Sequence, residues 1–397
     1  MALAFPAPLA PFAAHAADTR GRLHSEEESS TRTPFQRDRD RLLHTVAFRR
    51  LKHKTQVFVF HEGDHYRTRL THSLEVSQVA RSMARTLKLD EDLTEVVALA
   101  HDLGHPPFGH TGEDVLEDLM AGAGGFDHNA QTLRLLTKLE RQHGAYHGLN
   151  LTWETLEGTV KHNGPLIGAH RVKDKPLPTA IAEYTEKHDL WLDSFPSLEA
   201  QLAALADDIA YNNHDADDGL RAGLFTFDEA MDVPLLGPSL RAAVRAWPDE
   251  ACEVQIAEAI SALIGKMVAD VLSETRARLE EASPGSADDI RRADKSTAAF
   301  SATMTQEMTE LRQFLFERMY RHHKVNAVRS HAKRIVRDLF LLFVEEPEVL
   351  PPAWFERQRG ASLEKRKRVI CDYIAGMTDR YAIHEHKRLF DLSRNFL

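Results

Sequence analysis

The chain has 397 residues, with 50 lysines and arginines against 60 aspartates and glutamates, which gives a net charge of −10. This balance argues against a protein that coats nucleic acid with its whole surface. The two cysteines exclude a disulfide framework and a cysteine-rich zinc site and fit a cytoplasmic location; no apolar run is long enough to span a membrane. Seven of the 22 histidines fall between positions 61 and 128, and such clustering is typical of metal and phosphate sites.

An all-α fold is expected, because most segments after position 30 carry apolar residues at helical spacing. Residues 1–30 are expected to form a flexible tail. Helical patterns then cover 70–88, 91–103, 132–142, 152–161, 197–214, 250–281, 301–343 and 361–393. Gly104 and two prolines end the second of these helices, and Thr111 is the predicted N-cap of the next one. The run QVFVF at 56–60 is the one candidate for an edge hairpin.

Four polar residues predict a metal site: His72, the pair His101–Asp102, and Asp207. Each lies among apolar residues of a helical pattern, where a buried charge needs a partner, and a cation is the simplest one. Two imidazoles and two carboxylates suit Mn²⁺ or Mg²⁺ in octahedral geometry, and another divalent transition metal stays open. Four protein ligands leave two positions for water or phosphate oxygens, which favours metal-assisted attack on phosphorus.

With these four residues, the chain resembles the HD-domain superfamily of metal-dependent phosphohydrolases. The signature of that superfamily, H…HD…D, lies within residues 68–216 of this sequence. More closely, it resembles the bacterial deoxyguanosinetriphosphate triphosphohydrolase-like proteins. The matching segments are FQRDRDRLLHTVAFRRLKHKTQVF (35–58), GDHYRTRLTHSLEVSQVAR (63–81), AHDLGHPPFGHTGE (100–113), TLEGTVKHNGP (155–165) and ADDIAYNNHDADDGLR (206–221). The resemblance implies an HD helical bundle over 31–225 and a helical C-terminal extension over 226–397 that completes the nucleotide site and the oligomer contacts. It also implies hydrolysis of a deoxynucleoside triphosphate to the deoxynucleoside and inorganic triphosphate.

The resemblance assigns His72, His101, Asp102 and Asp207 to the metal, in agreement with the residue types. It assigns acid–base roles to His110 and Glu113, which lie three apart at a helix start and can meet on one face. A protonated histidine would assist departure of the sugar 5′-oxygen. His105 and His128 are further candidates for that acid or for phosphate binding, and the sequence leaves open which histidine donates the proton.

Six residues are implied to bind substrate. Arg69, three residues before His72, matches a phosphate-binding arginine. Tyr211 and Asp215 share a helix face with Asp207, in a DxxxYxxxD pattern whose tyrosine occupies the position of a 2′-hydroxyl and whose second aspartate reaches the 3′-hydroxyl. Gln56 matches a glutamine that contacts the same 3′-hydroxyl. Arg312 and Tyr320 match, more loosely, an arginine at the phosphates and an aromatic ring at the sugar or base.

Two alternatives remain open at the level of sequence. One is an HD phosphohydrolase acting on another nucleotide, although the GYP motif of the cyclic-dinucleotide enzymes is absent. The other is a catalytically silent nucleotide-binding or DNA-binding regulator. The expected partners are a deoxynucleoside triphosphate substrate, further copies of the chain in a homo-oligomer, and a deoxynucleoside triphosphate or single-stranded DNA as an effector. The preferred base is not determined by these residues.

Overall fold

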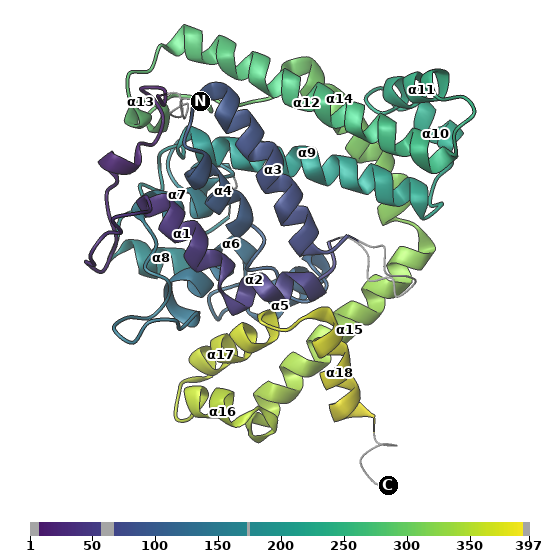
Figure 1. The fold of residues 1–397 in the computed structure, drawn as a ribbon. Coiled ribbons are helices and arrows are strands. Elements are labelled where there is room, and N and C mark those ends of the chain that lie inside the picture. The colour runs from purple at the N-terminus through teal and green to yellow at the C-terminus, as the bar shows by residue number, and fades with distance from the viewer. Residues whose placement is uncertain (1–7, 57–66, 173–174, 392–397) are drawn as a thin grey trace.

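The computed structural model describes residues 8–56, 67–172 and 175–391, and within these ranges it is helical, with isolated β-bridges and no strand (Figure 1). The all-α prediction is confirmed. The N-terminal helices are α1 (Pro34–Leu43), α2 (Val46–Arg50), α3 (Arg69–Leu87), α4 (Glu91–Ala100), α5 (His110–Leu119), α6 (His128–Arg134), α7 (Trp153–Lys161), α8 (Thr179–Thr185) and α9 (Leu198–Arg221). The later helices are α10 (Phe227–Met231), α11 (Gly237–Ala246), α12 (Cys252–Ala282), α13 (Ala287–Arg291), α14 (Ala302–Leu315), α15 (His323–Glu345), α16 (Pro352–Gln358), α17 (Leu363–Ala375) and α18 (Asp379–Phe390). The predicted hairpin at 56–60 lies outside the described residues beyond Gln56.

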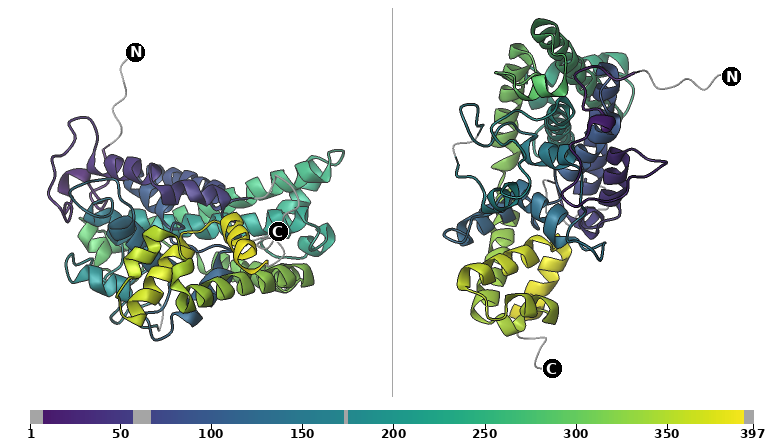
Figure 2. Two further views of the ribbon diagram at one scale, coloured as in Figure 1. Left: turned by 90° about the horizontal axis from the view of Figure 1, so that it is seen from below. Right: turned by 90° about the vertical axis from the view of Figure 1, so that its left-hand side faces the viewer.

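Three helices at the centre of the molecule, α3, α4 and α9, pack directly against one another and position the site. Helix α3 begins where Thr68 and Thr71 form a capping box, and it buries one apolar face that includes Val76 and Met83. Helices α12 and α14 pack on α9, whereas α15 to α18 form a separate layer at the C-terminal end (Figures 1 and 2). The three helices that position the site therefore all lie within the first 221 residues.

The segment between α4 and α5 makes a close turn. Gly104 fits against α6 so tightly that an added Cβ would lie 2.0 Å from the His128 carbonyl oxygen, so glycine is required there. Phe108 and Gly109 both adopt positive φ angles (66° and 56°), and Gly109 precedes the first residue of α5. The predicted N-cap at Thr111 is therefore wrong: the N-cap is Gly109, two residues earlier, because the backbone turn at Phe108–Gly109 already redirects the chain.

Residues 8–30 are held against the core, which differs from the flexible tail expected for residues 1–30. The amide of Ala14 donates a 2.8 Å hydrogen bond to Glu199, and the amide of Arg20 donates one of 2.8 Å to Glu154. Arg22 forms an ion pair with the buried carboxylate of Asp38. Buried carboxylates of the core thus bind this segment. The composition of the segment gave no sign of these carboxylate partners. Residues 1–7 lie outside the described ranges.

The buried N-cap residue Asp90 gives a prediction for the pH dependence of stability. Burial, reinforced by the neighbouring Glu199 carboxylate, raises the pKa of Asp90 to about 7 despite the hydrogen bond from the Leu93 amide. The unfolded chain releases this proton near pH 4, whereas the folded protein keeps it until about pH 7. The folded state therefore binds more protons between these values, and the free energy of unfolding falls as the pH rises through this window.

Asp90→Asn keeps the N-cap but removes the titration. At pH 7 we expect the variant to have a higher free energy of unfolding than the wild type, by on the order of 3 kcal/mol at most, and therefore to unfold at a higher temperature. Near pH 4 this advantage should disappear. Thermal unfolding followed by circular dichroism at several pH values measures the difference. A margin that stays constant from pH 4 to 7 would contradict the assignment.

The C-terminal layer fixes the segment that precedes α5. One carboxylate oxygen of Asp379 accepts from the Phe108 amide at 2.9 Å, and the other accepts from the amide and hydroxyl of Thr55 at 2.9 and 2.7 Å. The buried ammonium group of Lys54 donates to the carbonyl oxygens of His105 and Ala375. Residues far apart in sequence thus tie the turn before His110 to helices α17 and α18.

Asp379→Ala should therefore destabilise the protein and loosen this turn. The variant leaves the buried Phe108 amide and the Thr55 amide without their acceptor, at a cost of about 2–4 kcal/mol in the free energy of unfolding. Asp379→Asn is the matched control, because one carbonyl oxygen remains to accept a hydrogen bond. Chemical denaturation measures the free energy of unfolding, which should be highest for the wild type, lower for Asp379→Asn and lowest for Asp379→Ala. Equal stability of Asp379→Ala and the wild type would show that these hydrogen bonds contribute nothing.

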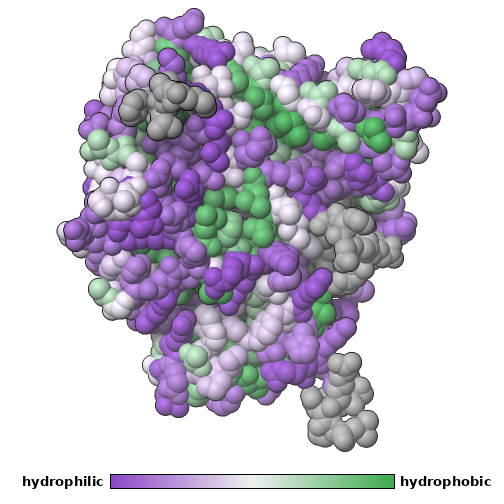
Figure 3. Space-filling model, in the orientation of Figure 1, coloured by the Kyte–Doolittle hydropathy of each residue, from purple (hydrophilic) through white to green (hydrophobic). Residues whose placement is uncertain are grey.

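None of the helices in the described ranges is both long and apolar enough to cross a membrane. The face drawn in Figure 3 is mostly hydrophilic, with smaller apolar patches among the polar side chains.

Candidate functional site

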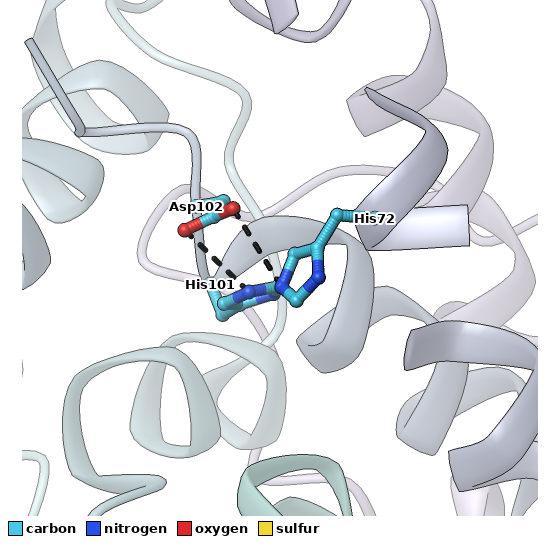
Figure 4. A group of neighbouring side chains, drawn as sticks. All are labelled: His72, His101 and Asp102. Atoms are coloured by element: carbon cyan, nitrogen blue, oxygen red, sulfur yellow. Dashed lines mark ion pairs between the residues drawn. The ribbon is translucent and has the colours of Figure 1, made fainter. Parts of the chain in front are cut away.

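His72, His101 and Asp102 form a buried cluster of metal-ligand type. His72 comes from α3, and His101 and Asp102 follow the last residue of α4, so the contact between these two helices brings the three side chains together (Figure 4). Their candidate ligand atoms all lie within 4.8 Å of one another. All three residues are buried. Three of the four predicted ligands thus lie in one cluster.

The fourth predicted ligand, Asp207, reaches the cluster from α9. Its Oδ1 lies 2.9 Å from His72 Nε2 and 3.5 Å from His101 Nε2. The Asp207 side chain is 35% exposed, whereas that of Asp102 is 4% exposed. Asp207 therefore closes the cluster on the side that solvent can reach.

The donor set fits a divalent cation. Nε2 of His101 and Oδ2 of Asp102 are buried and have no hydrogen-bond partner, which is costly unless a ligand binds them. Burial acts to lower the pKa of His101, but the carboxylates of Asp102 and Asp207 outweigh it and raise that pKa to about 9. The same negative field would attract a metal ion. Two histidines and two carboxylates match the ligand preferences of Mn²⁺ and, less closely, those of Mg²⁺.

A second cluster of side chains lies beside the first, around Glu113 of α5. One Glu113 oxygen lies 3.1 Å from His110 Nδ1, and the other accepts from the ring and the amide of His128 at 2.8 and 3.0 Å. The His110 side chain is 60% exposed, and that of His128 is 17% exposed. The predicted pair His110–Glu113 therefore meets on one helix face, and His128 joins it from the start of α6.

Electrostatics shifts the pKa values of His105 and His128 in opposite directions. Although burial opposes the shift, the two histidines around Glu113 lower its pKa well below the ordinary value, so it is a carboxylate. Burial would lower the pKa of His128, but Glu113 raises it overall. Burial and the nearby Arg69 guanidinium lower the pKa of His105 far below its ordinary value. Two histidines whose pKa values shift in opposite directions therefore stack on each other, with the His105 and His128 ring centres 4.1 Å apart.

Asp102 joins the two clusters. It accepts a 2.7 Å hydrogen bond from Arg69 Nη1, and its Oδ1 also lies 3.4 Å from His105 Nε2. Arg69 is buried, and its Nε has no partner. An added Cβ at Gly109 would lie 2.6 Å from Arg69 Nη2, so only glycine leaves room for this guanidinium. Arg69 thus sits between the candidate metal ligands and the turn that leads to His110.

The remaining predicted residues line α9 and the start of the C-terminal region. The hydroxyl of Tyr320 donates to Asp215 Oδ2 and lies 2.5 Å from the hydroxyl of Tyr211. Burial raises the pKa of Asp215 to about 8, and its other oxygen has no partner. Arg312 donates to Asp208 at 2.6 Å and to Asn212 at 3.1 Å. Tyr211, Asp215, Tyr320 and Arg312 therefore gather along α9.

Gln56, the last predicted substrate residue, is buried near the turn before α5. Its Oε1 has no partner, and its carbonyl oxygen lies 3.7 Å from the position of an added Cβ at Gly109. A cavity of about 530 Å³ adjoins the second cluster and is lined by His110, Glu113, His128 and apolar residues that include Phe126 and Leu166.

Comparison with known proteins agrees with this geometry. Residues 69–212 match the HD domain, and residues 298–388 match the phosphohydrolase-associated domain. The deoxyguanosinetriphosphate triphosphohydrolase-like protein of Parvibaculum lavamentivorans is 58% identical over 393 residues, 99% of each chain. That of Caulobacter sp. strain K31 is 57% identical over 385 residues, 97% of each chain. The chain belongs to the deoxyguanosinetriphosphate triphosphohydrolase-like family.

In this deoxyguanosinetriphosphate triphosphohydrolase-like chain, several residues that support the site were not among the candidates predicted from the sequence. Lys54 and Asp379 carried no local signal, because their partners are backbone groups far away in sequence. Glu75 and His214 could have been found: Glu75 lies one helical turn after His72, and His214 lies two turns after Asp207, so each shares a face with a predicted metal ligand.

Proposed function

We propose that this protein is a metal-dependent triphosphohydrolase that cleaves a deoxynucleoside triphosphate at the α-phosphate and releases the deoxynucleoside and inorganic triphosphate. The observation that carries the proposal is the contact between the two clusters. Asp102, a candidate metal ligand, lies 3.4 Å from His105, which stacks on the histidine that Glu113 holds. Such an arrangement offers a cation site and a proton donor to one phosphoester.

His72, His101, Asp102 and Asp207 would hold Mn²⁺ or Mg²⁺, which when bound supplies a Lewis acid for the α-phosphate and for the attacking water. The buried guanidinium of Arg69 has an unpartnered Nε and would bind a phosphate oxygen. His105, neutral and buried beside Arg69, would donate or accept a hydrogen bond at the same phosphate.

His110 would act on the leaving group. As water oxygen bonds to the α-phosphorus, the bond from phosphorus to the 5′-oxygen breaks, and that oxygen takes a proton from His110. Glu113 orients the imidazole through its 3.1 Å contact with Nδ1, which leaves Nε2 free to face the substrate. His128 shares the same carboxylate and is the second candidate for this proton.

The group along α9 would recognise the sugar. Tyr211 would fill the space of a ribose 2′-hydroxyl. The unpartnered oxygen of Asp215 would accept from the 3′-hydroxyl, and the side-chain amide of Gln56 would contact the same hydroxyl. Tyr320 holds Asp215 through a hydrogen bond, and Arg312 would leave Asp208 to reach the phosphates. This division predicts selectivity for deoxyribose and says nothing about the base.

A product assay tests the proposal. Purified protein is incubated with each of the four deoxynucleoside triphosphates and with GTP, alone and mixed, in Mn²⁺ or Mg²⁺, and triphosphate is separated from pyrophosphate and phosphate by anion exchange. Triphosphate from deoxynucleotides and none from GTP is the expected result. Activity only in nucleotide mixtures would support the proposed cleavage and would also show that a second nucleotide activates the enzyme. Pyrophosphate or phosphate as the product, or no product, would overturn the proposed cleavage.

We also infer that the protein acts as a cytoplasmic homo-oligomer, with a deoxynucleoside triphosphate or single-stranded DNA as its effector. Light scattering with and without these ligands measures the assembly, and a monomer under all conditions would contradict it.

A further inference from the structure

A chain of three side chains leads from the surface to His72 on the side opposite Asp207. His72 Nδ1 lies 3.1 Å from His214 Nδ1, and His214 Nε2 forms an ion pair with the carboxylate of Glu75. Glu75 and His72 lie one turn apart on α3, while His214 and Asp207 lie two turns apart on α9. The packing of α3 on α9 therefore sandwiches His72 between Asp207 and His214.

The three side chains become more exposed from His72 outward to Glu75. His72 is fully buried and the His214 side chain is 4% exposed, whereas that of Glu75 is 46% exposed and also pairs with Arg67 at 3.4 Å. His214 is buried, so its two nitrogens depend on Glu75 and His72 for their hydrogen bonds. The acidic end of the chain faces solvent, and its other end faces the candidate metal ligands.

The positions of the protons follow from the hydrogen bonds. If His72 binds a cation through Nε2, that nitrogen carries no proton, so the neutral ring must carry its proton on Nδ1. Nδ1 then donates to His214 Nδ1, which must be unprotonated. The proton of His214 therefore lies on Nε2 and is donated to Glu75. With a cation on His72 Nε2, only this arrangement satisfies all three contacts, and the Glu75 carboxylate favours it because it can only accept. Without a cation, Asp207 Oδ1, which lies 2.9 Å from Nε2, competes for a proton on that nitrogen.

We propose that Glu75 and His214 are positioning residues that hold His72 in the Nδ1-protonated tautomer and so prepare its Nε2 for metal binding. The inference rests on the metal site of the proposed function. A carboxylate that acts through an imidazole on a metal-bound histidine raises the basicity of that ligand and fixes the orientation of its ring. Here the carboxylate acts through a second histidine, which extends its reach from the protein surface to a fully buried ligand.

The test measures the binding of Mn²⁺ alone to the full-length protein, without substrate. Glu75→Leu removes the acceptor, and Glu75→Gln keeps a weaker one. Glu91→Gln is the matched control, because Glu91 is a partly exposed carboxylate that pairs with Arg81 and Arg85 and does not touch the site. Titration followed by electron paramagnetic resonance gives the Kd, and ¹⁵N chemical shifts of His72 in the metal-free protein report which ring nitrogen carries the proton.

For Glu75→Leu we expect a Kd about 10- to 100-fold higher and a mixed tautomer at His72. Glu75→Gln should fall between it and the wild type, and Glu91→Gln should match the wild type. A Kd within twofold of the wild type for Glu75→Leu, or an equal loss in Glu91→Gln, overturns the proposal. His214→Asn, which keeps an acceptor near His72 Nδ1 but breaks the link to Glu75, provides a second test with the same tautomer readout. Asp207→Ala distinguishes a failure of the metal site from a failure of the positioning role of Glu75 and His214. If Asp207→Ala binds Mn²⁺ with the wild-type Kd, the predicted metal site is wrong.

Discussion

Asp207→Ala is expected to abolish turnover and to remove the bound metal ion. The substitution takes away the carboxylate that lies 2.9 Å from His72 and closes the cluster toward solvent. Three donors would remain, and His101 would lose one of the two negative neighbours that favour a cation beside it. Because loss of a partner outside the coordination sphere already costs about 10- to 100-fold in affinity, loss of a ligand should cost at least 100-fold.

Metal analysis after gel filtration and triphosphate release measure the two effects together. Asp208→Ala is the matched control: Asp208 is the next residue on α9, is 48% exposed and faces Arg312 instead of the histidines. It should keep its metal ion, because Asp208 pairs with Arg312 and not with the candidate ligands. A full equivalent of Mn²⁺ in Asp207→Ala would show that the ligand set is different.

His110→Ala should separate chemistry from metal binding. The histidine touches Glu113 and lies outside the metal cluster, so metal content should match the wild type. Loss of the proton donor should lower kcat by about 10²- to 10⁴-fold, because the 5′-oxygen would have to leave unprotonated. Glu113→Gln should lower kcat less, since an amide oxygen can still orient one imidazole.

Rapid-quench measurement of triphosphate formation, with metal content determined on the same samples, checks this result. His128→Ala distinguishes the two histidines that share Glu113. If His110→Ala turns over at the wild-type rate while His128→Ala does not, the proton comes from His128. His331→Ala, a change at an exposed histidine of α15, controls for the removal of an imidazole elsewhere.

The candidate site could be predicted from sequence to the extent that its residues are local. His101–Asp102 and His110–Glu113 lie within a short segment whose helices, prolines and glycines are themselves readable, so their mutual proximity follows from helical geometry. The histidine that shares Glu113 was among the candidates, but its role stayed open. It is tertiary packing, including the close contact of Gly104 with α6, that places His128 at the carboxylate.

The flexible tail and the N-cap at Thr111 were expected from composition and local preference, and the structure departs from both. Residues 8–30 contain few large apolar side chains, yet Glu154, Glu199 and Asp38 supply buried acceptors that bind this segment. Propensity could not reveal those acceptors, since they come from helices more than a hundred residues away or from buried faces.

The sequence by itself determined the helical class, the order of the helices, the family and the types of residue at the site. Tertiary structure alone decided which residues support the residues of the site. It provides the hydrogen bonds from Asp379 and Lys54 to the turn before His110, and it places His214 and Glu75 behind His72. The physical reason is that helical periodicity is a short-range property of the chain, whereas the partner of a buried polar group is chosen by the packing of helices that are distant in sequence.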